Sequence, residues 1–472
     1  MGRLRILISI LISVDEETRI ALLEDGFLIE YFIERPHVKD IVGDIYKGRV
    51  ERILHGMGAA FVDIGLGKNG FLPLKDVNRS IGVGEEIIVQ VSREGKDLKG
   101  PRLTMKVGLP GRYILLLPGS DRVGISRRID RPSERKRLKE LISGSLPEGF
   151  GAVVRTAAKY ATDDGILEEL GELLSLWASI LENFNSVPTP SLLYSEPSLV
   201  RRVLRDWFSP EVKEICSDSK EVLKEVEEVL SRWGEDLSRI KLLYHNVPGV
   251  SLFEAYGVED ELRQLLSRKV SLLCGGEIVI DRTEALTVID VNTSSFVGEG
   301  SFERTALRTN LEAAREIGRQ LRLRGIGGIV IIDFIDMKSE RNKELVLKEL
   351  YSELEKDRRE VEVHSFSPLG LLELTREREG PDLVDRLGMT CPYCRGKGWV
   401  LSEETLMMDI KRRFKKFIAS NSFEIIEIIV SPKMKEPLEK VKEDWERSYG
   451  RKIVVLEDAD LPFEDFRLRG RA

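Results

Sequence analysis

Two apolar stretches that end in aspartate, Ala285-Leu-Thr-Val-Ile-Asp290 and Gly328-Ile-Val-Ile-Ile-Asp333, decide the fold class of this chain. Both are expected to be strands, and the second is a near-continuous apolar run of the kind buried inside an α/β sheet. The apolar stripe between them predicts a helix over residues 303–324, which Gly325 would end. Strands and helices therefore alternate from Gly275 to about Pro368, and this alternation predicts an α/β domain.

Asp290 and Asp333 stand where an α/β sheet presents its site, beyond the carboxyl ends of the strands. Asn292 lies two residues after Asp290, so it would point to the same side of the extended chain. Two converging carboxylates repel each other unless a cation lies between them, and oxygen ligands favour Mg²⁺ or Mn²⁺. Such an ion can polarise a phosphodiester and activate a water, with Asn292 orienting one carboxylate. The alternative is that strand-end aspartates only cap loops or helices.

The segment Cys391-Pro-Tyr-Cys394-Arg-Gly-Lys-Gly398 has the form of half a tetrahedral zinc site. A redox pair is the competing interpretation, but no thioredoxin-like context surrounds it. Cys216 and Cys274 are isolated, and no histidine lies nearby. The same cysteine pair from a second subunit would complete the site, which predicts a zinc-linked homodimer.

Short strands separated by glycines between Val42 and Ser92 suit a small closed barrel of the OB type. Phe61 and Phe71 lie on neighbouring predicted strands, and the cations close to them in sequence are Lys47, Arg49 and Lys68. Aromatic rings beside cations suit the stacking of bases in single-stranded nucleic acid. The alternative is that both rings belong to the core of the barrel.

The composition is that of a folded protein with several domains: 472 residues, 42% hydrophobic and 32% charged. No apolar run approaches the ~18 residues of a membrane span. The apolar start, which lacks a signal-peptide cleavage site, is expected to be a strand. Four cysteines are too few for a disulfide framework.

The net charge of −7 argues at first against a nucleic-acid partner. However, residues 101–140 hold eleven Lys/Arg and four Asp/Glu, a local charge of +7, while residues 161–190 hold six acids and no Lys or Arg. This segregation indicates either solvated helix faces or a phosphate-binding track.

Taken together, these residues resemble the RNase E/G endoribonucleases, whose motifs occur here in family order over nearly the whole chain. The motifs that carry the resemblance are Ile45-Tyr-Lys-Gly-Arg, Ala59-Ala-Phe-Val-Asp, Gly70-Phe-Leu-Pro-Leu, Ile125-Ser-Arg-Arg-Ile, Val154-Arg-Thr-Ala, Ile289-Asp-Val-Asn, Thr309-Asn-Leu-Glu-Ala-Ala, Arg319-Gln-Leu-Arg-Leu-Arg, Ile332-Asp-Phe-Ile-Asp-Met and Cys391-Pro-Tyr-Cys.

The resemblance implies an α/β multidomain architecture in six parts. These are a discontinuous RNase H-like domain (1–38 and 200–268), an S1-like OB domain (39–105), a 5′-phosphate sensor region (106–199), a DNase I-like catalytic domain (269–385), a zinc link (386–400) and a small C-terminal α/β domain (401–472). The chain has no long tail after the catalytic region, so it looks like the shorter G type of the family.

The resemblance also implies roles for single residues. Asp290 and Asp333 would hold Mg²⁺, and Asn292 would support them. Phe61, Phe71 and Lys99 would contact the RNA strand, while Arg155 and Thr156 would grip a 5′-monophosphate, for which an arginine fork is apt. Cys391 and Cys394 would bind the Zn²⁺ that links two protomers, with dimers pairing into tetramers.

The expected function is a cytoplasmic, Mg²⁺-dependent endoribonuclease that cuts single-stranded RNA in rRNA maturation and mRNA decay. A non-catalytic protein that binds single-stranded RNA is the alternative from another class. A metal phosphodiesterase acting on DNA is a third possibility.

Overall fold

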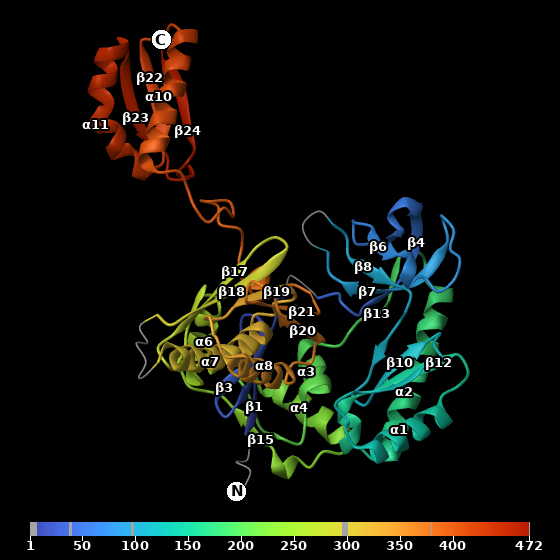
Figure 1. Ribbon diagram of the computed structural model, residues 1–472. Helices are drawn as coiled ribbons and strands as arrows, with labels where there is room; N and C mark the ends of the chain where they lie inside the picture. Colours follow the sequence, from blue (N-terminus) through green and yellow to red (C-terminus); the bar gives the residue numbers. More distant parts are fainter. Residues whose placement is uncertain (1–6, 37–39, 96–98, 295–300, 379, 472) are drawn as a thin grey trace. The chain divides into compact units, whose positions relative to one another are not determined.

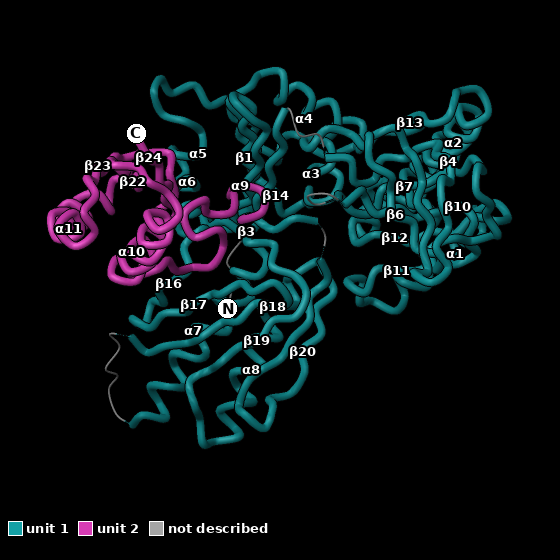
Figure 2. The backbone as a smooth tube through the Cα atoms, turned by 90° about the horizontal axis from the view of Figure 1, so that it is seen from above, with its two compact units in different colours: residues 1–383 teal, residues 384–472 magenta. Residues whose placement is uncertain are grey.

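A computed structural model of the chain divides into two compact units, residues 1–383 and 384–472, which Figure 2 draws in different colours. Within the part of the chain that the structure describes, no helix is both long and apolar enough to cross a membrane. The described residues are 7–36, 40–95, 99–294, 301–378 and 380–471.

The amino-terminal strands form a five-stranded sheet, ordered β15-β14-β1-β2-β3, with a later part of the chain. β1 pairs antiparallel with β2 and parallel with β14, so strands about 200 residues apart in sequence are neighbours. Residues 199–266 hold four helices, with two strands between them. The elements are β1 (Ile8–Ser13), β2 (Thr18–Glu24), β3 (Phe27–Glu34), α3 (Leu199–Trp207), β14 (Val212–Ser217), α4 (Lys220–Arg232), β15 (Lys241–Tyr244), α5 (Leu252–Ala255) and α6 (Val258–Leu265).

A closed barrel follows in sequence, as the glycine-punctuated strands predicted. β4 pairs with both β5 and β7, which closes the ring β4-β5-β6-β8-β7, and β13 pairs with the first residues of β4, before those that pair with β5. The strands are β4 (Ile45–Leu54), β5 (Ala59–Asp63), β6 (Gly70–Pro73), β7 (Glu86–Arg93), β8 (Arg102–Thr104) and β13 (Ser191–Tyr194).

The next region is a four-stranded sheet, ordered β11-β12-β10-β9, whose apolar side chains share one core with two helices. Thr162 caps the long helix α2, since its side chain accepts a hydrogen bond from the Gly165 amide. The elements are β9 (Leu109–Pro110), β10 (Ile114–Pro118), β11 (Val123–Ile125), α1 (Pro132–Ser145), β12 (Phe150–Val154) and α2 (Asp163–Ser186).

The α/β region predicted around the two aspartates is a six-stranded sheet, ordered β16-β17-β18-β19-β21-β20, with α7 and α8 packed on it through one apolar core (Figure 1). The two helices approach closely at Gly318, where an added Cβ would lie 2.6 Å from Glu353 Cγ. The elements are β16 (Lys269–Ser271), β17 (Glu277–Arg282), β18 (Leu286–Asn292), α7 (Phe302–Leu323), β19 (Gly328–Asp333), α8 (Glu340–Leu354), β20 (Val361–Phe366) and β21 (Leu371–Arg376).

The second unit holds the cysteine pair and a small α/β fold. Its three-stranded sheet, ordered β23-β22-β24, packs on two helices around a core that includes Phe414 and Trp445. The short helix α9 (Leu383–Leu387) precedes the cysteines. The elements that follow are α10 (Glu403–Ser420), β22 (Ile425–Val430), α11 (Pro432–Tyr449), β23 (Lys452–Glu457) and β24 (Phe466–Arg471).

Candidate active site and RNA interface

The two aspartates predicted to form a metal site are brought side by side. β18 and β19 are parallel neighbours, and their register pairs Asp290 with Asp333. Asn292, one pleat further along β18, donates from Nδ2 to Asp290 Oδ2 at 2.7 Å. All three therefore lie at one edge of the sheet, and the amide holds one carboxylate in orientation.

The negative charges of the carboxylates at this edge of the sheet repel one another, so each carboxylate makes ionisation of its neighbours less favourable. Partial burial raises the pKa of Asp333 above its ordinary value, and the negative charges of Asp290 and then Asp336 raise it further. A cation between the carboxylates would relieve this repulsion, and oxygen atoms are the ligands that Mg²⁺ prefers. The donors at this edge therefore fit a magnesium ion that keeps open positions for water and phosphate.

The loop after Asp333 is held by α7. Asn310, fully buried, donates to the Ile335 carbonyl at 2.8 Å and accepts from the Ile335 amide at 3.1 Å. Glu303 accepts hydrogen bonds from the Lys338 and Ser339 amides. Sequence reasoning assigned no role to Asn310 or Glu303. The feature of the sequence that points to Asn310 is its position, as a polar residue, on the apolar side of a predicted helix.

Among the described residues, no group of three or more His, Cys, Asp and Glu side chains is arranged to hold a metal ion. Asp290 and Asp333 on their own offer two carboxylate ligands, so an ion held by them would keep positions for water or substrate oxygens. That arrangement is the usual one for Mg²⁺, which keeps several of its waters.

The barrel presents the two predicted aromatic rings together. Phe61 and Phe71 are register partners on β5 and β6, both half-buried, with ring centroids 6.0 Å apart in an edge-to-face arrangement. Lys99 is exposed. Lys47, expected beside these rings, instead lies buried and donates to the carbonyls of Phe184 and Val187. Its long stem reaches α2, so Lys47 has a structural role.

The predicted sensor pair lies where β12 ends. Arg155 Nη2 donates to Asp206 Oδ1 at 2.5 Å, and Arg155 Nη1 donates to the Gly111 carbonyl. Thr156 Oγ1 lies 3.0 Å from Ser126 Oγ. Asp206 was missed from the sequence because it is 51 residues away from Arg155.

Asp206 is held in its ionised form. Burial would raise its pKa, but the hydrogen bonds and charge of Arg205, together with those of Arg155, lower the pKa below its ordinary value. The Arg155 guanidinium is thereby fixed against a carboxylate, with its position set before any phosphate binds.

Part of the basic segment 101–140 serves the fold. Arg112 is buried against the ring of Trp233 and pairs with Glu235, and Arg135 donates to the Ser126 and Ile129 carbonyls. Arg128 donates to the Lys356 and Asp357 carbonyls of the segment that leads into β20. Three of the eleven cations in this segment therefore contact other parts of the fold, while Lys106, Arg122, Arg127, Arg131, Lys136 and Lys139 are exposed.

In the second unit, the cysteine pair forms an exposed, tightly turned segment. Cys391 is exposed and Cys394 half-buried, whereas Cys216 and Cys274 are buried in the first unit. Backbone amides of Gly398 and then Gly396 donate to Cys394 and lower the pKa of its thiol. A lowered thiol pKa suits a metal-binding thiolate. The two sulfurs therefore fit half of a zinc site.

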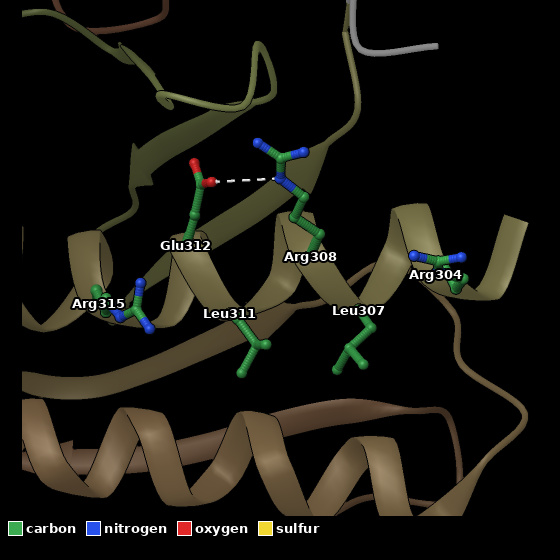
Figure 3. A pocket seen from close by; sticks show the side chains of 6 residues that line it. All are labelled: Arg304, Leu307, Arg308, Leu311, Glu312 and Arg315. Carbon is green, nitrogen blue, oxygen red and sulfur yellow. Dashed lines mark ion pairs between the residues drawn. The ribbon is translucent and has the colours of Figure 1, made fainter. Parts of the chain in front are cut away.

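A separate shallow hollow of about 250 Å³ lies along α7, away from the two aspartates. Figure 3 shows Leu307 and Leu311 pointing to the neighbouring helix, and the ion pair of Arg308 with Glu312 on the opposite side. Glu312 also accepts a hydrogen bond from the Cys274 amide at 2.7 Å. The hollow is lined by Arg304, Leu307, Arg308, Leu311, Glu312 and Arg315.

Two family models match most of the chain. Residues 39–106 match the S1 RNA binding domain, and residues 108–379 match the ribonuclease E/G family. The chain is 39% identical to Ribonuclease G of Haemophilus influenzae over 443 residues, which cover 89% of this chain and 90% of the relative. It is 38% identical to Ribonuclease G of Escherichia coli K12 over 442 residues, with the same coverage. To Ribonuclease E of that strain it is 37% identical over 88% of this chain, but only 41% of the relative is covered.

These similarities define an endoribonuclease that carries an S1 RNA-binding domain. The chain belongs to the ribonuclease E/G family, and in length it corresponds to the relatives named Ribonuclease G.

Proposed function

We propose that this endoribonuclease depends on Mg²⁺, cuts single-stranded RNA and is stimulated by a 5′-monophosphate, with roles in rRNA maturation and mRNA decay. The observation that carries the proposal is the register of Asp290 with Asp333 on parallel strands. Because both carboxylates meet at one edge, their oxygens would share a single divalent cation.

Each residue at this edge of the sheet would have a separate role. Asp290 and Asp333 would hold the ion, and Asn292 would keep Asp290 oriented through its 2.7 Å hydrogen bond. When bound, Mg²⁺ supplies a positive charge that polarises the phosphodiester and lowers the pKa of a water. Asn310 keeps the loop after Asp333 in place through its two bonds to Ile335.

The remaining roles concern how RNA is held. Phe61, Phe71 and Lys99 would contact the strand at the barrel, because two half-buried rings offer stacking surfaces and an exposed amine offers a phosphate contact. Arg155 and Thr156 would bind the 5′-monophosphate, and the fork of Arg155 is already oriented by Asp206.

We also propose a homodimer joined by one Zn²⁺ that Cys391 and Cys394 share with the same pair of a second copy, the pairing of dimers into tetramers, and a cytoplasmic location. The two-residue thiol donor set, which is half of a tetrahedral site, supports the dimer. The six-part domain division, with RNase H-like and DNase I-like domains, likewise belongs to this proposal.

The test uses single-stranded RNA oligomers that carry a 5′-monophosphate or a 5′-hydroxyl, incubated with Mg²⁺ and either wild type or Asp333→Asn. We expect internal cuts by wild type that need Mg²⁺ and are faster on the 5′-monophosphate, with activity lost in the variant. Asp260→Asn, a change of an exposed aspartate on α6, is the matched control. No metal-dependent cut by wild type would overturn the proposal, and equal rates on the two oligomers would remove only the sensor roles.

A non-catalytic protein that binds single-stranded RNA is the alternative. The paired, oriented carboxylates disfavour it, since binding alone needs no converging acids near a polyanion. The same incubation with a DNA oligomer separates an endoribonuclease from a metal phosphodiesterase that acts on DNA.

A further inference from the structure

Two leucines project from the sheet edge that holds Asp290 and Asp333. Leu273 is as exposed as in an extended chain, at 103%, and Leu369 is 84% exposed. Large apolar side chains this exposed to water contribute nothing to the packing of the protein. Both leucines nevertheless lie beside a candidate active site.

The strand register places one leucine on each side of the aspartates. The turn that carries Leu273 leads into β17, whose first residue, Glu277, pairs with Asn292. The turn that carries Leu369 leads into β21, whose first residue, Leu371, pairs with Asp333. Among the four neighbouring strands β17-β18-β19-β21, Asp290 and Asp333 therefore lie on the two inner strands. A leucine lies in the turn that leads into each of the two flanking strands.

Both turns reach the site closely. An added Cβ at Gly276 would lie 2.9 Å from the Asn292 carbonyl oxygen, and one at Gly370 would lie 3.9 Å from Asp336 Oδ1. Three strand spacings of about 4.8 Å separate the outer strands, a span of about 14 Å. That span holds the scissile phosphate with a nucleotide on each side, since stacked nucleotides rise by only about 3.4 Å.

The turn that carries Leu273 is rigid. The Gly275 amide donates to the Leu272 carbonyl at 2.9 Å, and the Leu272 amide donates to the Gly276 carbonyl at 2.8 Å. Glu312 of α7 accepts from the Cys274 amide, which pins the turn to the helix. Leu273 is thus held out in water by its backbone.

The turn that carries Leu369 is equally well defined. In Ser367-Pro-Leu-Gly370, the Gly370 amide donates to the Ser367 carbonyl at 2.9 Å, and Ser367 Oγ accepts from the Leu371 amide. Proline and glycine stand at the second and fourth positions that such a β-turn favours. Side chains fixed in this way lose little further freedom when they contact a ligand.

We propose that Leu273 and Leu369 are base-contacting residues that pack against the nucleobases on the two sides of the scissile phosphate. This inference rests on the proposed function, because it takes Asp290 and Asp333 as the place of cleavage. The leucines carry no charge and offer no hydrogen bond, so they would hold any base by its apolar face without selecting its identity. Together they would keep the phosphate centred over the carboxylates.

The test combines Leu273→Ala and Leu369→Ala with RNA oligomers that lack one base, immediately 5′ or 3′ of the cut. Each variant is expected to lower kcat/KM about tenfold on the complete oligomer, the effect of one lost apolar contact. On the oligomer that lacks the contacted base, the same substitution should have no further effect, and each leucine should respond to a different missing base. Leu345→Ala, a change of a 42% exposed leucine on α8, is the control.

Binding of the same fluorescently labelled oligomers, followed by anisotropy in EDTA, tests the contacts without cleavage. If wild type cuts no RNA but the leucine variants bind the complete oligomer less tightly, the proposed function fails and the contacts stand. If wild type cuts RNA and both variants bind and cut as it does, the inference is overturned. Effects equal on complete and abasic oligomers would also overturn it. So would unchanged cleavage with an altered sedimentation coefficient, because the leucines would then face a second copy of the chain.

Discussion

Asp206 and Arg155 form an ion pair that ties the end of α3 to the end of β12, with Asp206 Oδ1 2.5 Å from Arg155 Nη2. The same oxygen also accepts from Arg205 Nε at 3.1 Å. One carboxylate thus orients two guanidinium groups, and a phosphate that binds Arg155 would meet a fork whose direction is already set.

Arg155→Lys should remove most of the preference for 5′-monophosphorylated RNA. A lysine keeps the charge but cannot contact Asp206, Gly111 and a phosphate as a planar fork does. We expect the ratio of cleavage rates on 5′-monophosphate and 5′-hydroxyl oligomers to fall to about 1, with the 5′-hydroxyl rate unchanged. Arg122→Lys, at an exposed site in the same region, should keep the wild-type ratio. A preserved ratio in Arg155→Lys would exclude Arg155 as the phosphate ligand.

Asn292→Ala should weaken the response to Mg²⁺ without unfolding the protein. The variant loses the donor to Asp290 Oδ2, and loss of such a supporting bond lowers metal affinity by about 10–100-fold. A Mg²⁺ titration of cleavage should therefore shift to higher concentration. Asn185→Ala on α2 is the control, and a titration curve that does not move would show that Asn292 does not orient the metal ligand.

Phe71→Leu should weaken binding of single-stranded RNA by ~1–3 kcal/mol, the contribution of stacking one base on a ring. Leucine retains much of the apolar contact within the barrel but offers no ring face, so the melting temperature should change little. Equilibrium binding to a labelled RNA oligomer measures the effect. Phe27→Leu, an exposed ring on β3 outside the barrel, should bind as wild type does.

Cys394→Ser should release zinc and convert dimers to monomers, because serine is a poor zinc ligand. Wild type is expected to contain half an equivalent of zinc per chain, which elemental analysis with native mass spectrometry measures. Cys216→Ala, at a buried cysteine of the first unit, should keep both zinc and dimer. One zinc per chain in wild type would contradict a site shared between two subunits.

Glu30→Gln should stabilise the protein at high pH. Burial raises the pKa of Glu30 to about 7, and nearby arginines, led by Arg359, offset this only in part. The unfolded chain ionises near the ordinary value of 4.5, so the stability that neutral Glu30 contributes is lost as the pH rises from there through about 7.

Glutamine stays neutral, so Glu30→Gln should melt near the wild-type temperature at about pH 5 and above it at about pH 8. Glu344→Gln, at an exposed position on α8, is the control and should show no such change with pH. Equal melting temperatures of wild type and Glu30→Gln at both pH values would place the Glu30 carboxylate in a solvated environment.

Local sequence determined the elements that carry the site. The runs that end in Asp290 and Asp333 are strands, and residues 302–323 form the helix between them, because burial on a sheet or along a helix leaves a periodic apolar pattern in the chain itself. The side shared by Asp290 and Asn292 also followed from sequence, since successive side chains of a strand alternate in direction.

Only the tertiary structure decided which distant residues meet. Asp206 reaches Arg155, Asn310 holds the loop after Asp333, and Lys47 turns to α2. Strands β14 and β15 lie among helices in sequence, and they complete a sheet with β1, β2 and β3 from the start of the chain. Likewise, it is the strand register, and not the sequence, that places the two exposed leucines on either side of the aspartates. The periodicity of apolar residues indicates which side of each segment is buried. Long-range contacts depend on how the strands pair, and no local pattern specifies that pairing.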